Sequence, residues 1–459
     1  MKKVMLYMSA ALLLSSCGLY NKYDRPEVNA SGIVRDPVSM TDTLAVQDTT
    51  SFGNMPWRTV FTDPQLQVLI QQGLDNNPDL LNAALNVHMV ETALTVAKLA
   101  FLPSVAISPQ GTLSSFDGAA ATKAYTLPVS ASWNVDLFGN LLSQKRSAQM
   151  KLLATKDYQV AVQTQIICGV ANLYYTLMML DEQLAIVTDM EGLTKDTWDM
   201  MQLQMQLGRA RSTSVQTAEA NYYSVQAKKA DLKRQIREME NSMSLLLNEA
   251  GHQIARGKFY NQSLPTSFST GVGIQLLSNR PDVHAAEMSL AQCFYDTETA
   301  RSRFYPSLKV TGTAMFTNSL GSAVVNPGKW ILSAVGSLTQ PIFQHGQIVA
   351  GLKVAKAQQE QALNTFQQTI LKAGNEVSNA LLAYNTCDEK SKLDEKQVKI
   401  YEQNVEDTKL LYTSKGSSYL EVIQAQNGLL NARISKVTDD FNKMQAVVNL
   451  YQALGGGSK

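Results

Sequence analysis

One stretch of the chain changes its hydrophobic period without an intervening linker. From Tyr125 to Leu137, apolar residues occupy every second position and polar residues lie between them, which predicts a strand with one apolar and one polar face. After Phe138 and Gly139, apolar residues recur at the spacing of a coiled-coil helix. This seam is Ile166, Val170, Leu173, Leu177, Leu180, Leu184 and Val187. A membrane-type strand that continues into a long helix predicts a tube that crosses a membrane and extends beyond it.

A shorter helix and another strand precede this stretch. Asp63 and the proline after it are typical of a helix start, with the aspartate as the N-cap. The alternating segment at about 101–113 then pairs with the strand at about 125–138 as a hairpin. The long helix, at about 140–207, has a length of roughly 100 Å. It ends at a turn near Gly208 and is followed by a returning helix with its own apolar seam.

The same plan recurs in the second half of the chain. Aligned without a gap, residues 74–104 and 277–307 share nine identities in 31 positions, where chance gives roughly two. A second hairpin, with strands at about 304–317 and 330–343, and a second long helix, at about 346–412, follow. The offset between the repeats is 203 residues at first and 207 in the long helices. The chain is therefore expected to be a duplication of a helix, hairpin, long helix and returning helix.

The N-terminus reads as a signal peptide, with a basic Lys2 and Lys3 before an apolar core that ends at Leu14. The four residues that end at Cys17 resemble the lipobox of bacterial lipoproteins, in which the cysteine becomes the lipidated first residue. A plain signal peptide with an accidental cysteine is the alternative. Gly18 follows the cysteine, where aspartate would resemble an inner-membrane retention signal, so the outer membrane is favoured.

These patterns divide the chain into six segments. We expect a lipoprotein signal peptide at 1–16, a lipid-anchored extended arm at 17–60, a first repeat at 61–258, a connector at 259–272, a second repeat at 273–454 and a flexible tail at 455–459. The arm is polar and contains prolines, which suits an extended linker.

Composition narrows the classes of function. The chain is 45% hydrophobic and 17% charged with a formal charge of +1, so it has no basic excess for nucleic acid. No internal run approaches the roughly 20 apolar residues of a membrane helix. A bilayer is therefore expected to be crossed by strands, whose backbone groups must be paired within the protein.

Catalytic and metal motifs are missing from the sequence. The four histidines are scattered, and no nucleophile elbow, HExxH, P-loop or CxxC pattern accompanies them, so we expect no enzyme activity, no cofactor and no metal site. Met200, Met201 and Met205 suggest a Cu(I) site, since thioethers suit that ion. Core packing is the favoured interpretation, because Met201 and Met205 continue the heptad. Cys387 also falls on a seam, where it is expected to act as a small buried hydrophobe.

Several motifs together carry a family resemblance. They are the lipobox, the duplicated Asn-x-Pro-Asp and Phe-x-Pro-Ser, the strand end 133–139, its counterpart 340–346 and the turn segment 416–426. Their combination resembles outer membrane efflux proteins of the TolC type, in the lipoprotein branch that partners drug and metal pumps. The resemblance covers nearly the whole mature chain.

The resemblance implies a fold and partners. It implies a mainly α protein with a membrane β-barrel, assembled as a homotrimer with one 12-stranded barrel and an α-helical periplasmic tunnel. Its implied partners are a periplasmic adaptor, an inner-membrane pump and outer membrane lipid, and its implied role is a passive exit duct for drugs or other small molecules. A duct for protein secretion or metal ions, and a coiled-coil envelope lipoprotein that transports nothing, are the alternatives. Four strands cannot close a barrel alone, which independently favours several chains.

The alternation assigns the two faces of the strands. We expect lipid to contact Val105, Ile107, Val129, Trp133, Leu308, Val310, Leu332 and Leu338. We expect the lumen to be lined by Ser130, Ser132, Asn134, Thr311 and Thr313. Loops 114–124 and 317–329 then lie outside the cell, because the helices leave from the opposite strand ends.

The resemblance also implies a periplasmic gate. In the family, a hydrophobic residue and an acid one turn later constrict the pore, and these positions fall on Leu420 and Gln424, one helix face. The glutamine departs from the acidic pattern, although Glu421 lies nearby and carries a charge. Plain packing is the alternative, because Leu420 also begins the apolar seam that runs through Ile423 and Leu430.

Overall fold

Helices and strands alternate along the chain as the repeated pattern predicts. The computed structural model describes residues 21–27, 52–115, 117–118, 120–265, 280–317, 330–414 and 418–457. The elements before the connector are η3 Phe52–Asn54, α2 Trp57–Val60, α3 Pro64–Asn76, α4 Pro78–Leu99, β1 Ser104–Ile107, β2 Gln110–Ser114, β3 Thr122–Val135, α5 Asn140–Gln206 and α6 Ser212–Leu246. Those that follow are η4 Phe259–Asn261, α8 Pro281–Ser302, β4 Ser307–Thr317, β5 Trp330–Thr339, α9 Gln347–Thr413 and α10 Tyr419–Ala453.

Two compact units share these elements. The first comprises Met1–Val28, Leu85–Asp157 and His284–Gln368, and holds the sheet with the helices next to it in sequence. The second comprises Asn29–Ala84, Tyr158–Val283 and Thr369–Lys459, and holds the returning helices α6 and α10.

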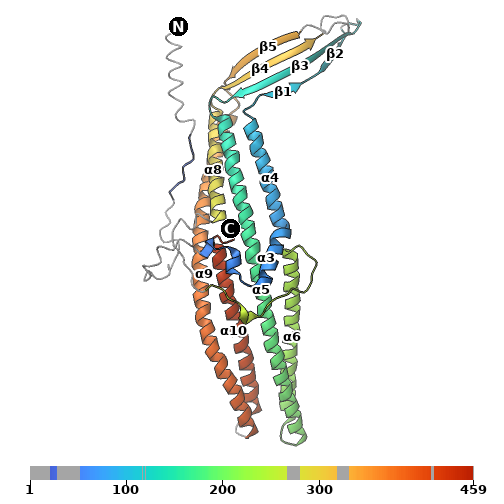
Figure 1. Cartoon of the computed structure of the whole chain (residues 1–459), viewed down its shortest axis with the longest axis vertical. Helices are drawn as coiled ribbons and strands as arrows, with labels where there is room; N and C mark the ends of the chain where they lie inside the picture. The colour runs from blue at the N-terminus through green and yellow to red at the C-terminus, as the bar shows by residue number, and fades with distance from the viewer. Residues whose placement is uncertain are drawn as a thin grey trace. The chain divides into compact units, whose positions relative to one another are not determined.

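All strands form one antiparallel sheet in the order β1, β3, β4, β5, with β2 also on β3 (Figure 1). The predicted first strand is divided into β1 and β2 at Ser108 and Pro109. The register is unchanged across this gap, from Ile107 opposite Val129 to Gln110 opposite Thr126. Proline lacks the N–H that a ladder needs, so the pairing is interrupted without a shift.

The strand ends differ from the predicted ones for the same reason. β1 and β4 begin after Pro103 and Pro306 rather than at 101 and 304, and β5 ends before Pro341 rather than at 343. β3 ends at Val135 because the next residue, Asp136, turns toward α5 and accepts a hydrogen bond from the backbone N–H of Leu142 at 2.8 Å.

The helices reproduce the duplication residue for residue. α5 and α9 are both 67 residues long, α6 and α10 are both 35, and α4 and α8 are both 22. The long and returning helices of the second repeat each begin 207 positions after their counterparts, which matches the sequence offset.

The core of the second unit lies along the predicted seams. Ile166, Val170, Leu177, Leu180 and Val187 of α5 are buried, and Leu173 and Leu184 pack against them. α10 adds a second row to the same core, which includes Leu429, Leu430, Val437, Val447, Val448 and Leu450. Cys387 is only half-buried, so its expected burial in the seam of α9 is wrong.

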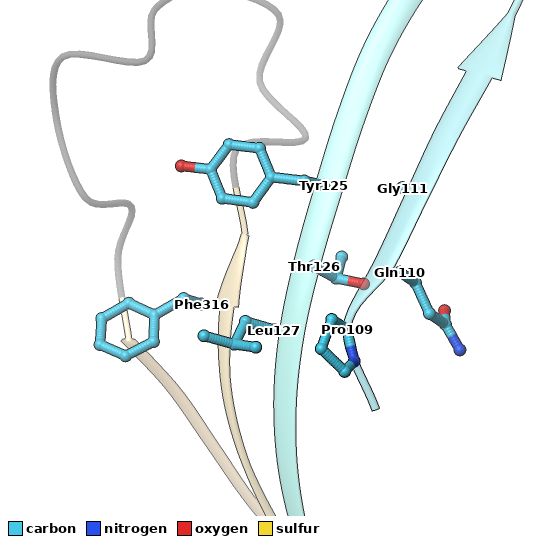
Figure 2. A pocket seen from close by; sticks show the side chains of 7 residues that line it. All are labelled: Pro109, Gln110, Gly111, Tyr125, Thr126, Leu127 and Phe316. Atoms are coloured by element: carbon cyan, nitrogen blue, oxygen red, sulfur yellow. The ribbon is translucent and has the colours of Figure 1, made fainter. Parts of the chain in front are cut away.

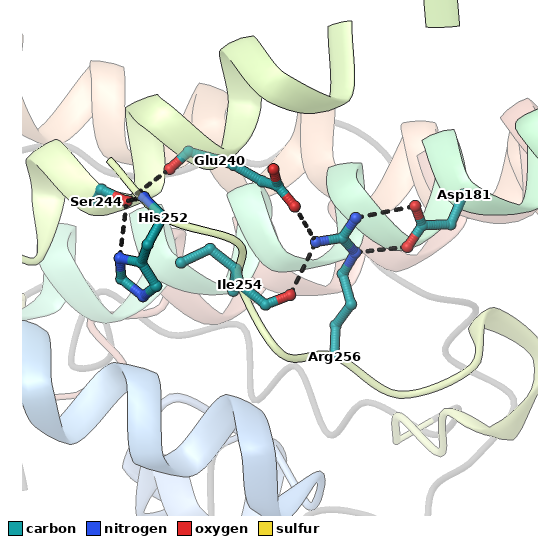
Figure 3. A network of polar contacts seen from close by, with 6 residues as sticks. All are labelled: Asp181, Glu240, Ser244, His252, Ile254 and Arg256. Atoms are coloured by element: carbon teal, nitrogen blue, oxygen red, sulfur yellow. Dashed lines mark hydrogen bonds and ion pairs between the residues drawn. The ribbon is translucent and has the colours of Figure 1, made fainter. Parts of the chain in front are cut away.

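The irregular segment that follows α6 is fixed to the helical hairpin of α5 and α6 by an arginine. Arg256, whose side chain is nearly buried, donates to Asp181 of α5 at 2.9 Å and to Glu240 of α6 at 2.8 Å (Figure 3). It also donates to the carbonyl of Ile254 at 2.8 Å. Because its guanidinium bonds to one carboxylate on each helix, Arg256 holds the irregular segment against both α5 and α6.

Two terminal predictions need correction. The arm predicted at 17–60 is not extended throughout, because Phe52, Trp57 and Val60 are buried in the core and the last two belong to a short helix. The tail predicted at 455–459 is not free at its start. Residues 455–457 are buried, and Gly457 accepts a hydrogen bond from Gln163 at 3.1 Å. Both features were missed because the apolar residues of the arm are widely spaced and the tail is a run of glycines, so neither segment has a hydrophobic period.

The part of the arm at 21–27 lies against α8 in the first unit. The ring of Tyr23 contacts that of Phe294 edge to face at 5.9 Å, and its backbone N–H donates to the Tyr295 hydroxyl at 3.3 Å. Arg25 pairs with Glu287 of α8 at 3.5 Å. This strap covers polar side chains of α8 that would otherwise meet solvent.

Within the described residues, α4 has no such cover, and one of its exposed faces is apolar. Among the described residues it is the one helix long and apolar enough to cross a membrane, with a mean hydropathy of 1.2, which departs from the expectation that no internal segment qualifies. One face, with Ala83, Val87 and Leu94, is buried. The opposite face exposes Leu81, Leu85, Met89, Val96 and Leu99. A helix normally turns an apolar face of this size toward a core, so we expect a partner to cover it.

Candidate channel wall and gate

The strand register sorts the sheet into an apolar and a polar face. Val129 lies opposite Ile107 and Ala314, Trp133 opposite Val310, and Leu338 opposite Leu308. Paired residues share a face, so all eight residues predicted to contact lipid lie on one side of the sheet. Most of them are exposed in the single chain.

The other face carries the residues predicted to line the lumen. Ser132 lies opposite Ser104 and Thr311, and Ser130 opposite Ala106 and Thr313. The remaining members of this face include Thr126, Asn134, Lys309, Thr317, Ser333, Ser337 and Thr339. One-sided polarity of this kind lets a sheet separate lipid from water.

Aromatic residues gather on the apolar face near the hairpin loops. Tyr125, Leu127 and Phe316 surround a shallow hollow, and the amide of Gln110 is directed away from them (Figure 2). Phe316 lies directly opposite Leu127 in the ladder. Aromatic rings at one level of a membrane sheet suit the boundary between lipid and water.

The connection between α5 and α6 begins with a glycine at the end of α5. Gly208 has a φ of 68°, its N–H donates to Met205, and the N–H of Arg209 donates to Gln204 at 2.8 Å. These bonds form a Schellman turn, in which the positive φ favours glycine. α6 then starts at Arg211, whose side chain makes no capping hydrogen bond.

The N-terminus of α10, the second returning helix, is capped by side chains, unlike that of α6. Ser418 and Glu421 form a capping box, and the Ser418 hydroxyl donates to the Glu421 carboxylate at 3.1 Å. Glu421 also lies in the first turn, where the helix dipole favours a negative charge. The turn residue Gly416 lies outside the described residues.

The predicted gate residues share the outer face of α10. Leu420 is 56% exposed, and Glu421 and Gln424 are exposed as well. Leu420 therefore does not begin the packed seam within the single chain. The seam uses Tyr419, Val422, Ile423, Ala425 and Gln426 instead, because the helix turns by about 100° per residue and places Leu420 on the opposite side.

A small hydrophobic core lies near the end of the α5–α6 and α9–α10 helical hairpins. Met201, Val215, Ala218, Tyr419 and Ile423 form it, with Trp198 and Tyr412 packed around them. The Tyr412 hydroxyl contacts the Met201 sulfur at 3.4 Å. Met201 thus packs as predicted, whereas Met205 is 40% exposed and does not continue the heptad.

The sequence pattern does not predict the polar contacts between the α5–α6 hairpin and the α9–α10 hairpin. Gln426, which is buried in the α10 seam, donates to Thr197 of α5 at 3.0 Å. The next residue, Asn427, donates to Asn221 of α6 at 3.3 Å. A glutamine at a seam position is the one signal that could have identified the first link.

Two other predictions concern the cysteines and the lack of a metal site. Cys17 lies outside the described residues, so its lipidation stays a prediction. Cys168, Cys293 and Cys387 are free thiols. Among the described residues, no three His, Cys, Asp or Glu side chains are placed to hold a metal ion.

An antiparallel sheet with one apolar face, one polar face and two open edges, continued by paired helices, defines a subunit of a membrane channel. The sequence pattern of the family described as outer membrane efflux protein matches residues 69–249 and 273–456. The chain belongs to this family.

Individual relatives cover nearly the full length. The cation efflux system protein CusC of Escherichia coli O157:H7 is 26% identical over 450 residues, or 97% of each chain. The toluene efflux pump outer membrane protein TtgC of Pseudomonas putida is 27% identical over 465 residues, which cover 97% of this chain and 94% of TtgC. A crystal structure of CusC superimposes with a TM-score of 0.86 at 24% identity, over 95% of this chain and 99% of that one.

Family membership confirms the class that the motifs implied. The chain is an outer membrane efflux channel protein, mainly helical with a membrane sheet and an internal repeat. The alternative of a coiled-coil lipoprotein that transports nothing is set aside, because the family is one of channel proteins.

Proposed function

We propose that three copies of this chain close one twelve-stranded barrel and form the passive exit duct of a tripartite pump. The observation that carries this is the pair of open edges, β1 with β2 on one side of the sheet and β5 on the other. Lipid offers no partners for unpaired backbone groups, so each edge must pair with another chain. Antiparallel order continues when β5 of one copy meets β1 of the next.

The bare face of α4 supports the same assembly. α4 leads into β1 and β5 leads into α9, so pairing of these edge strands brings α4 of one copy next to the start of α9 of another. Val349 and Val354 near that start are exposed. Two exposed apolar surfaces become buried together, which favours association by about 25 cal/mol per Å² of apolar surface removed from water.

Cross-linking tests the closure. Ala106→Cys in β1 and Val335→Cys in β5, placed in a background without the native thiols, should yield a covalent trimer with a short bis-maleimide. Each single variant should stay monomeric on a denaturing gel and serves as the control. A double variant that yields only dimers would contradict a closed ring of three.

Conduction tests the duct. The purified protein should form single channels in a planar bilayer, because the polar face would line a water-filled lumen. An assembled trimer without channels would contradict a transport role.

The hairpin loops are proposed to lie outside the cell and the helices in the periplasm. A cysteine at Asp117 or Asn318 should react with an impermeant maleimide on whole cells. Labelling at these positions only after cell breakage would reverse the orientation.

We propose that Cys17 carries the lipid anchor, as its lipobox-like setting indicates. Mass spectrometry of the mature N-terminus should find acyl chains on this cysteine. An N-terminus at another residue, without acyl chains, would contradict the anchor.

Leu420 and Gln424 are proposed to narrow the periplasmic end of the duct. Both are exposed in the single chain, which suits a role between copies. Gln424 makes the ring polar rather than charged, and the Glu421 carboxylate supplies charge beside it.

The variant Leu420→Ala with Gln424→Ala should raise single-channel conductance and leave the melting temperature nearly unchanged, because neither side chain is packed. Leu430→Ala is the matched control. Leu430 is buried, so this change should cost about 2–5 kcal/mol of stability without widening the pore. Unchanged conductance in the double variant would remove these residues from the gate.

The cargo is proposed to be small molecules handed over by the partner pump through a periplasmic adaptor. CusC is named for cations and TtgC for toluene, so relatives of similar identity serve different cargo. One exposed thioether, that of Met205, does not make a Cu(I) site. Cross-linking in cells followed by identification of the co-purified pump tests this assignment, and recovery without any inner-membrane pump would contradict it.

A further inference from the structure

Two carboxyl groups face each other inside the second helical hairpin, which is formed by α9 and α10. Asp439 of α10 is 5% exposed, and its Oδ1 accepts a hydrogen bond from the Lys390 ammonium of α9 at 2.6 Å. The carboxyl of Asp394, one turn farther along α9, is within hydrogen-bonding reach of Asp439. Oδ2 of Asp394 is closed off from solvent and has no hydrogen-bond donor. An ionised Asp394 would therefore place a second, unmatched charge there.

The first hairpin has apolar residues at the same positions. The offset of 207 pairs Asp394 with Val187, Asp439 with Leu232, and Lys390 with Gln183. Val187 and Leu232 are both buried in the core. The hairpin fold therefore does not need acids here, since its other copy is closed by an apolar contact.

The surrounding groups favour a proton on Asp394. Burial raises the pKa of Asp394, and the carboxylates of Asp439 and Asp440 raise it further, against the opposing effect of Lys390. Asp440 itself is paired with Lys436 at 2.7 Å. From α5, the uncharged Gln183 donates to Thr438 at 3.1 Å. The carboxylate of the next α5 residue back, Glu182, acts with Asp440 on Tyr260.

We propose that Asp394 holds a proton against Asp439 and makes the α9–α10 hairpin a proton-sensitive element, more tightly closed in acid than at neutral pH. With the proton in place, Asp394 donates it to Asp439 and Lys390 neutralises the remaining charge. When the proton leaves, two carboxylates face each other with a single lysine. The hairpin then opens more often.

The direction follows from linkage. A carboxyl whose pKa is raised in the folded state binds more protons there than in the open state, so stability falls as pH rises from the ordinary carboxyl value through the raised one. Within that window, each pH unit raises the opening constant by up to about tenfold. Above the raised pKa the effect is complete.

Hydrogen exchange of the full-length protein tests the proposal without need of channel activity. Exchange rates of α9 and α10 amides, corrected for the intrinsic rate at each pH, are compared between pH 4 and pH 8, with α5 and α6 as the internal reference. Protection of the second hairpin should fall at the higher pH and that of the first should not. Asp394→Asn keeps a hydrogen-bond donor without a charge, so it should hold the acid-like protection at both pH values.

Two further variants complete the test. Glu395→Gln changes an exposed acid on the same helix and should keep the parent pH response. Asp394→Val with Asp439→Leu copies the first hairpin and should remove the response. Equal pH dependence of both hairpins in the parent, or a response that survives both Asp394→Asn and the apolar copy, would overturn the proposal.

Discussion

The two repeats have equal helix lengths but opposite surfaces in their short helices. α4 exposes an apolar face, whereas α8, its counterpart, buries polar side chains that include Glu287, Thr297, Glu298, Thr299 and Ser302. The strap at 21–27 packs on α8, and α4 has no equivalent cover in the described residues. Duplication has preserved the lengths, because these fix where the hairpins turn. The faces have diverged, because each meets different neighbours.

The same contrast occurs where these helices begin. Asn77 donates to the carbonyl of Leu246 at the end of α6, at 2.8 Å. Its counterpart Arg280 donates to the carbonyl of Ala453 at the end of α10, at 2.7 Å. An amide and a guanidinium thus satisfy equivalent helix ends, although only the guanidinium brings a buried charge.

Arg280→Ala should have the largest effect of the changes that probe this contrast. Arg280 is 6% exposed and pairs with Asp282 at 2.8 Å and with Glu376 at 2.7 Å. Its removal leaves the buried Ala453 carbonyl without its donor and two partly exposed carboxylates without the guanidinium, which should lower the free energy of unfolding by about 2–3 kcal/mol in denaturant titration. Arg433→Ala, which breaks a more exposed pair with Glu402, is the control and should cost less than about 1 kcal/mol. Equal costs would mean that the burial of Arg280 is unimportant.

Asn77→Ala should cost less, because no charge is left behind. The Asn77 side chain also accepts from the backbone N–H of Asp79 at 2.9 Å and so caps α4. Loss of the cap and of the bond to Leu246 should lower the unfolding free energy by about 1–2 kcal/mol in the same titration. A loss as large as that of Arg280→Ala would show that charge does not distinguish the two repeats here.

The starts of the returning helices offer the smallest change. α10 has a capping box and α6 does not, so Arg211→Ser with Ser214→Glu would give α6 the pattern of Ser418 and Glu421. The transplanted cap should stabilise the protein by about 0.5–1 kcal/mol, measured as a rise in melting temperature. Ser214→Glu alone is the control and should give only a part of this gain. A lower melting temperature for the double variant would mean that Arg211 stabilises the protein in some way other than capping.

The sequence predicts those features that depend on period alone. The seam from Ile166 to Val187 and the two faces of the strands follow from spacings of 3.5 and 2, and the duplication is legible from matched prolines. Leu420 and Met205 were misplaced because a seam residue and its neighbour one position away look alike in an apolar stretch. Only the helix phase, set by contacts with α5 and α6, separates them.

Other features depend on residues that are distant in sequence. Nothing beside Asp394 indicates that Asp439 will face it, and nothing beside Gly457 indicates that Gln163 will donate to its carbonyl. The buried start of the final glycine segment is therefore missed by any local pattern. The exposed face of α4 is the converse case, because a single chain does not contain what covers it.

The pairing of β3 with β4 has a consequence for biogenesis. This ladder runs from Thr126 opposite Thr317 to Val135 opposite Leu308, so one strand comes from each repeat and the whole first helical hairpin lies between them in sequence. Long-range pairing of this kind requires a large loop to be closed before any bond is gained, and it forms slowly. The sheet therefore cannot be completed until the ribosome has produced both halves. Until then its apolar strands stay unpaired and prone to aggregation.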